Sequence, residues 1–160
     1  MQLTDVLLAV LALAVGLALA WRASGLARLL VFGSAVLVSG LLFMPGEQIT
    51  GLVGKDGIRS LRALAGLTPW DISELTHFFI FVWLGLLLWL ARPDMRGWKA
   101  WGLVVVLAVA AEVAQGLAPA REPRFDDVLL NLAGGMAGLL LAIAGMALTR
   151  PRRNRGNMAP

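Results

Sequence analysis

The sequence predicts an all-α protein: a polytopic transmembrane helix bundle of about five spans, forming a single domain over residues 1–160. Hydrophobic residues make up 59% of the chain and charged residues only 15%, whereas a soluble domain is about half apolar and a quarter charged. The apolar residues gather in five segments, each near the roughly 17–25 residues that a helix needs to cross a bilayer. These segments use most of the chain, so no stretch is left for a second domain.

The five predicted spans are residues 6–21, 29–44, 75–91, 98–117 and 128–148. The first follows MQLTD, which carries Asp5 where a signal peptide has basic residues, so we expect a retained helix rather than a cleaved leader. Between the second and third spans, the segment DGIRSLRALAG has apolar residues at helical spacing. This pattern fits either a short helix lying in the outer interface or a solvated loop.

Basic residues in the connections predict that the N-terminus faces outward and the C-terminus faces the cytoplasm. Lys and Arg follow the first and third spans and fill the tail, residues 149–160, and cytoplasmic segments carry such an excess. The loops 45–74 and 118–127 mix both signs and should face outward. Because the tail is read as an orientation signal, nucleic acid is not an expected partner.

Two features of the composition exclude whole classes of site. The chain has no cysteine, which excludes disulfides, thiolate metal sites and a cysteine nucleophile. It has one histidine, His77, which excludes a site built from several histidines.

We single out five polar side chains in or directly beside the last three predicted spans, all toward the outward ends of those spans: His77, Glu112, Gln115, Asp127 and Asn131. At a rise of 1.5 Å per residue, each should sit within roughly 10 Å of the outer boundary. Spacings of three or four residues place Glu112 with Gln115, and Asp127 with Asn131, on common helix faces. Ionisable groups at such depth usually face the bundle interior and are functional candidates.

Each of these residues also has a plain structural interpretation. Glu112 could join helices by pairing with Arg121 or His77, and Gln115 and Asn131 could hold helices together. Asp127 could complement the positive end of a helix dipole. Solvation in a loop explains three further charged residues: Glu122, Arg124 and Asp126.

Small residues follow Asn131 along one side of the last span. Gly134, Gly138, Ala142 and Gly145 share this side, and small residues allow a neighbouring helix to approach closely. We therefore expect Gly134 and Gly138 to pack against another helix, with the last span central in the bundle.

The combined spacing resembles the VanZ-like family of bacterial integral membrane proteins, named for a teicoplanin resistance protein. The resemblance rests on Glu112-x-x-Gln115, Pro119-x-Arg121, Asp127, Asn131 and the two glycines, on HFFIFVWLGLLL from His77, and on LLFMPG at 41–46. It covers roughly residues 29–148, which makes the first helix look like an addition to a four-helix core. Where the family commonly has Asp and Lys before the histidine, this chain has Ser73 and Glu74, so a role for that lysine does not carry over.

The resemblance implies a multi-pass protein of the bacterial plasma membrane whose namesake lowers teicoplanin susceptibility. Proposals that such proteins act on lipid headgroups fit an outward-facing polar pocket. The substrate would then be the phosphate-containing headgroup of a phospholipid or of a polyprenyl-linked envelope lipid.

In such a pocket, Arg121 could grip phosphate with two hydrogen bonds, and Glu112 and His77 form the natural acid–base pair. Asp127 could orient His77 or hold a divalent cation with Glu112, while Gln115 and Asn131 could fix phosphate oxygens. No nucleophile is evident, and Ser73 is the nearest hydroxyl.

Two other functions compete with this hypothesis. A non-catalytic protein could bind a lipid, cell-wall precursor or lipoglycopeptide with the same residues. A proton-coupled carrier would need midplane polar residues and an internal repeat, and the sequence shows neither.

Overall fold

A computed structural model describes residues 3–43, 46–117 and 124–149, which form six α-helices and one 3-10 turn, with no strand in these ranges. In chain order they are α1 (Leu3–Ala20), α2 (Gly25–Phe43), α3 (Gly46–Ala65), α4 (Ile72–Ala91), η1 (Pro93–Met95), α5 (Trp98–Gly116) and α6 (Phe125–Thr149). The predicted all-α fold is confirmed, and each of the five predicted spans coincides with a helix, with bounds that differ by a few residues.

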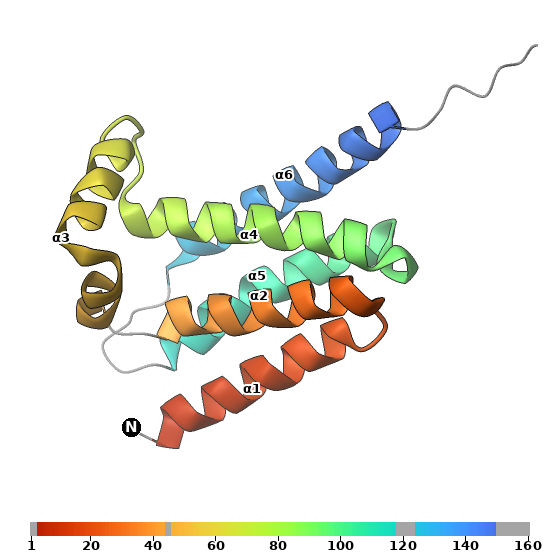
Figure 1. Cartoon of the computed structure of the whole chain (residues 1–160), viewed down its shortest axis with the longest axis horizontal. Helices are drawn as coiled ribbons and strands as arrows, with labels where there is room; N and C mark the ends of the chain where they lie inside the picture. Colours follow the sequence, from red (N-terminus) through yellow and green to blue (C-terminus); the bar gives the residue numbers. More distant parts are fainter. Residues whose placement is uncertain (1–2, 44–45, 118–123, 150–160) are drawn as a thin grey trace, which may run out of the picture.

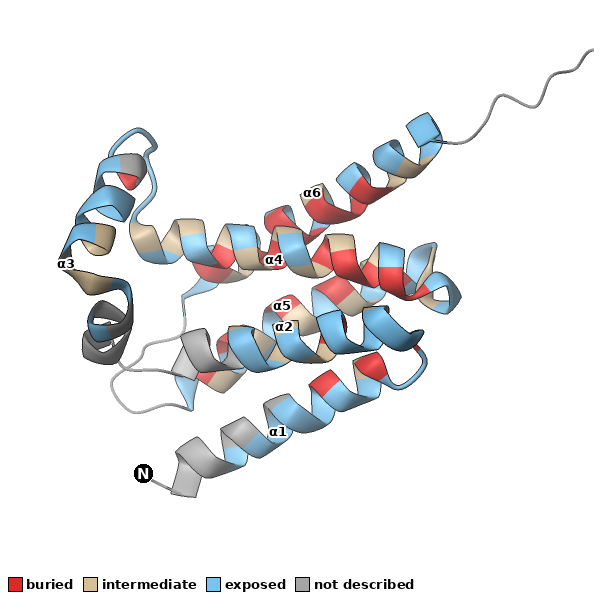
Figure 2. Cartoon of the chain, in the orientation of Figure 1, coloured by how far each residue is buried: buried red, intermediate tan, exposed pale blue. Residues whose placement is uncertain are grey.

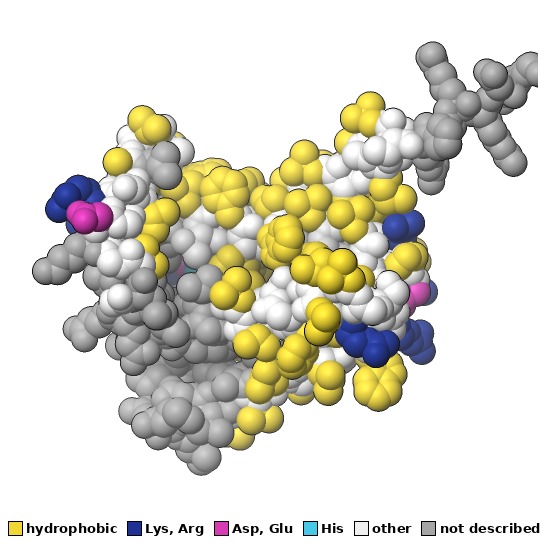
Figure 3. Space-filling model, in the orientation of Figure 1, with side chains coloured by type: hydrophobic (Ala, Val, Ile, Leu, Met, Phe, Trp, Pro, Cys, Tyr) yellow, Lys and Arg dark blue, Asp and Glu magenta, His cyan; other side chains and the backbone are white. Residues whose placement is uncertain are grey.

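Three of the described helices, α4, α5 and α6, are long and apolar enough to cross a membrane. Large apolar side chains such as Val106 and Leu140 point away from the bundle and are more than half exposed. Apolar side chains also cover much of the surface seen in Figure 3. Such an exterior suits lipid, so the chain is a membrane protein; five spans and an N-out orientation stay predictions.

Helices α4, α5 and α6 pack around a shared apolar core. Leu88 of α4, Ala100 and Val104 of α5, and Leu139 of α6 form one buried cluster. Buried residues accordingly line the facing sides of these helices in Figure 2.

Helices α1 and α2 form a hairpin that packs on α4 (Figure 1). Ala20, Val31 and Ala91 make a second buried cluster where the three helices meet. The indole N–H of Trp83 on α4 also donates a hydrogen bond to the Ser34 hydroxyl on α2, at 2.9 Å.

Helix α3 lies across the end of the bundle at which α4 begins (Figure 1). It breaks at Gly54, whose φ of 76° is one that glycine adopts readily. All but the last residue of the segment DGIRSLRALAG is helical within α3, so the loop interpretation was wrong. Its position in the membrane interface stays a prediction.

Candidate functional site

His77 and Asn131 meet where α4 and α6 lie side by side. The Nδ1 atom of His77 is 3.0 Å from Oδ1 of Asn131. An imidazole N–H at this position donates to the amide oxygen. Both side chains are buried, with exposed fractions of 3% and 0%. The structure therefore brings these two predicted residues into direct contact inside the bundle.

Two glycines that follow Asn131 along α6 let α4 and α6 approach closely. A Cβ on Gly134 would overlap the Phe78 carbonyl, and one on Gly138 would overlap the Val82 carbonyl. The structure thus places both glycines against the backbone of α4.

The predicted stripe of small residues needs one correction. Gly145 is exposed and has open space around it. The C-terminal end of α6 diverges from α4 in Figure 1. Gly135 makes a contact that the spacing argument missed: a Cβ there would overlap Val104 of α5. Adjacent glycines thus face two different helices, which places α6 between α4 and α5.

Glu112 joins the end of α5 to the beginning of α6. Its Oε1 accepts a hydrogen bond from the backbone N–H of Arg124, the residue before α6. The side chain is 5% exposed. A carboxylate at this position satisfies one of the N–H groups left free at a helix start and complements the positive end of the dipole.

Arg124 is a site residue that the sequence analysis missed. Its guanidinium lies 3.7 Å from Oε1 of Glu74 in the first turn of α4. Glu74 also accepts from the backbone N–H of Asp71, whose own carboxylate accepts from the backbone N–H of Glu74 in a capping box. The available signal was opposite charge at the starts of two helices, which becomes informative only once those starts are known to be neighbours.

Four buried polar atoms at this end have no hydrogen-bond partner among the described residues. They are Glu112 Oε2, Gln115 Nε2, Asp127 Oδ1 and Asn131 Nδ2. Such groups are rare in folded proteins because burying them unpaired costs about 1–3 kcal/mol each. We call the five residues His77, Glu112, Gln115, Asp127 and Asn131 the outer polar cluster, and this end of the bundle the outer end, after the side on which the predicted orientation places them.

The predicted acid–base pair is not in direct contact. No hydrogen bond joins Glu112 to His77 within the described part of the chain, where each has a different partner. Gln115 and Asp127 are buried at the same end, at 4% and 7% exposure. Arg121 lies outside the described residues.

This end of the bundle has a hollow beside it, but the described residues do not form a metal site there. No three His, Cys, Asp or Glu side chains in the described ranges gather as a metal site requires, so Glu112 and Asp127 gain no third ligand of these types there. A hollow of about 620 Å³ opens between the end of α3 and the start of α4. Its lining includes Arg62, Trp70 and Ser73.

Comparison with known proteins finds a family match. A family model described as VanZ/LLP1 matches residues 7–148. The matched region begins within α1, so α1 lies inside the family model, where the sequence motifs had suggested a start near residue 29. No curated protein and no solved structure matches the chain.

Proposed function

The chain belongs to the VanZ/LLP1 family, and from this premise we propose that its outer polar cluster acts on the phosphate-containing headgroup of a membrane lipid. The lipid is a phospholipid or a polyprenyl-linked lipid of the bacterial cell envelope, in the plasma membrane. One observation carries the proposal: four side chains of the cluster are buried yet keep a polar atom unpaired among the described residues. Unpaired donors and acceptors suit a polar ligand that replaces water.

Each residue is given a chemical role from the helix that carries it and from its functional group. His77 comes from α4 and Glu112 from α5, so they would meet a substrate from two sides, one as proton donor and the other as acceptor. Gln115 Nε2 and Asn131 Nδ2 are N–H donors that suit phosphate oxygens. Asp127 would hold a proton or a hydroxyl of the headgroup, and Arg121 would grip phosphate with its planar fork.

A series of contacts links the hollow between α3 and α4 to the outer polar cluster. Asp71 and Ser73 line the hollow, and their neighbour Glu74 pairs with Arg124. The backbone N–H of Arg124 in turn donates to Glu112. This series supports entry of a headgroup between α3 and α4, with Glu74 and Arg124 at the threshold.

A non-catalytic lipid-binding protein is the second candidate, and a specific observation favours it. His77 and Glu112 each already hold two helices together through one hydrogen bond, which is what structural polar residues in membranes do. In that case the same unpaired atoms would bind a headgroup, a cell-wall precursor or a lipoglycopeptide without turnover. An effect on glycopeptide susceptibility is compatible with either candidate.

Mass spectrometry of copurifying lipids separates the two candidates. Wild-type protein and Glu112→Gln are purified in parallel, their lipids are identified, and each protein is then incubated with the lipids found. Glu112→Gln keeps size and hydrogen bonding but removes proton transfer. Headgroup loss or exchange by the wild type alone establishes an enzyme, whereas an enriched and unaltered lipid in both samples establishes a binding protein. Equal turnover by both proteins removes Glu112 from the mechanism.

Arg121→Lys tests the grip on phosphate in the same assay. Lysine keeps the charge but loses the two-pronged geometry. We expect weaker lipid retention by Arg121→Lys, and unchanged retention would remove Arg121 from the site.

A further inference from the structure

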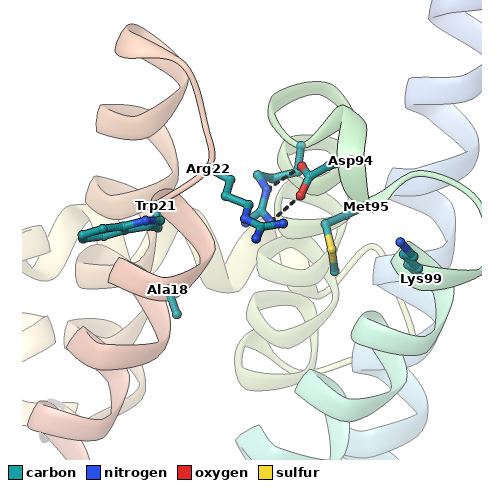
Figure 4. Close-up of a pocket in the computed structure, with 7 residues that line it drawn as sticks. Ala18, Trp21, Arg22, Asp94, Met95 and Lys99 are labelled. Atoms are coloured by element: carbon teal, nitrogen blue, oxygen red, sulfur yellow. Dashed lines mark hydrogen bonds and ion pairs between the residues drawn. The ribbon is translucent and has the colours of Figure 1, made fainter.

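A second hollow, of about 480 Å³, opens at the opposite end of the bundle. It lies between the end of α1, the turn η1 and the start of α5 (Figure 4). We call it the basic hollow. Its lining consists of Ala18, Trp21, Arg22, Arg92, Asp94, Met95 and Lys99.

The only carboxylate in this lining, that of Asp94, is paired with an arginine. Arg92 donates from Nε and Nη2 to the two oxygens of Asp94, each at 2.8 Å. The hydrogen bonds from Arg92 and the positive charges of Arg92 and Arg22 lower the pKa of Asp94 to about 2. Asp94 is therefore charged at neutral pH and is engaged by Arg92.

Arg22 and Lys99 keep their positive charges available. Both are exposed and form no hydrogen bond or ion pair with another described residue. Figure 4 shows Arg22 reaching from the α1 side toward Asp94, with Met95 and Lys99 on the α5 side. Two cations from different helices thus flank one hollow, with a net charge that favours an anion.

The surroundings point to a lipid rather than to a soluble anion. The indoles of Trp21 and Trp98 are 72% and 79% exposed at this end, and exposed indoles are typical of the headgroup level of a membrane. Ala18 lies one turn deeper in the hollow, and the neighbouring Leu17 is 52% exposed on an apolar helix. An acyl chain could lie along α1 while its phosphate meets the cations.

We propose that the basic hollow binds the phosphate of an anionic phospholipid, with Arg22 and Lys99 as the contacting cations. Basic pockets between transmembrane helices bind anionic headgroups in this way. The positive-inside rule predicts that this lipid belongs to the inner leaflet. The site is separate from the outer polar cluster and does not depend on the proposed function.

Lipid retention by the full chain tests the proposal. The protein is placed in nanodiscs containing phosphatidylglycerol and phosphatidylcholine, and bound lipid is counted by native mass spectrometry after ejection from the disc. We compare wild type with Arg22→Gln/Lys99→Gln. The control is Lys55→Gln/Arg59→Gln on α3, which removes the same charge at the other end of the bundle. Free glycerol phosphate is titrated as a soluble competitor.

We expect wild type and the control to retain phosphatidylglycerol over phosphatidylcholine, and Arg22→Gln/Lys99→Gln to lose about 30-fold in this preference. The charge-conserving Arg22→Lys/Lys99→Arg should recover most of it, which separates charge loss from misfolding. Unchanged preference in Arg22→Gln/Lys99→Gln would overturn the proposal. Displacement by glycerol phosphate at equal concentration would also overturn it, because the site would then take a soluble anion.

Discussion

The two ends of the bundle bury polar groups in opposite ways. At the outer end, Glu112 and Asn131 are each buried with one polar atom unpaired among the described residues, and α4 and α6 are held by glycine contacts. At the other end Arg92 is 6% exposed, yet it bonds both oxygens of Asp94 and the Leu19 carbonyl. Satisfied polar groups stabilise a fold, whereas unpaired ones cost stability. Arg92 therefore stabilises its end of the bundle, whereas under the proposed function the unpaired atoms of the outer polar cluster stay available for a headgroup.

The largest expected effect is at His77. In His77→Asn the amide nitrogen takes the position of Nδ1 and can still donate to Asn131, so the α4–α6 contact survives, but proton transfer is lost. Headgroup turnover should fall about 10²–10⁴-fold, with a melting temperature close to that of wild type. A turnover rate within a few-fold of wild type would place His77 with Arg92, as a structural residue.

Gly138 tests what holds the outer end together. In Gly138→Ala the new Cβ would meet the backbone of Val82 and Leu86, which cannot rotate away. We expect a loss of unfolding free energy of about 3 kcal/mol, measured as thermal unfolding in detergent.

Gly145→Ala is the matched control on the same helix, because its Cβ meets open space. It should be neutral or more stable by about 0.5–1 kcal/mol, since alanine favours helix. Equal effects of the two substitutions would remove the argument that close backbone contact positions the cluster.

Arg92→Gln probes the satisfied end. Loss of its bonds to Asp94 and to Leu19 should lower the unfolding free energy by about 2 kcal/mol. The loss should not be larger, because Asp94 stays solvated after its partner is removed. Headgroup turnover per folded molecule should not change. A selective loss of turnover in Arg92→Gln would couple the two ends and break the comparison.

The smallest expected effect is that of acid on the contact between Arg92 and Asp94. The pKa of Asp94 is lowered to about 2 in the folded state, against about 3.9 in an unfolded chain. A lowered pKa contributes stability that is complete above about pH 4 and is lost as the pH falls toward 2. The melting temperature of wild type should drop over this range more than that of Arg92→Gln, and parallel curves would contradict the assignment.

Helix positions followed from the sequence because apolar runs of sufficient length define them without tertiary information. Burial of Glu112 and Asn131 followed as well, since charge and amide groups within such runs must turn inward. Contacts between distant residues did not follow. Spacing along α6 could not show that Gly145 has open space around it or that Gly135 contacts Val104.

The sequence also could not identify the ion-pair partners of residues in the connections between helices. The sequence analysis interpreted Arg124 as a solvated loop residue. Its pairing with Glu74 could not be predicted, because it requires α4 and α6 to begin side by side at the same end of the bundle. The Arg92–Asp94 pair needed the turn η1, which no apolar pattern predicts. Polar pairs of this kind are specified by the fold rather than by local sequence.

The most direct test of the account is the rate of headgroup turnover in membranes reconstituted with the copurified lipid, measured for wild type, Glu112→Gln and Arg92→Gln at a temperature where all three are folded. We expect Arg92→Gln to retain the wild-type rate and Glu112→Gln to lose it. Turnover by Glu112→Gln at the wild-type rate, or an equal fall in both variants, would contradict the assignment of the outer polar cluster as the working site.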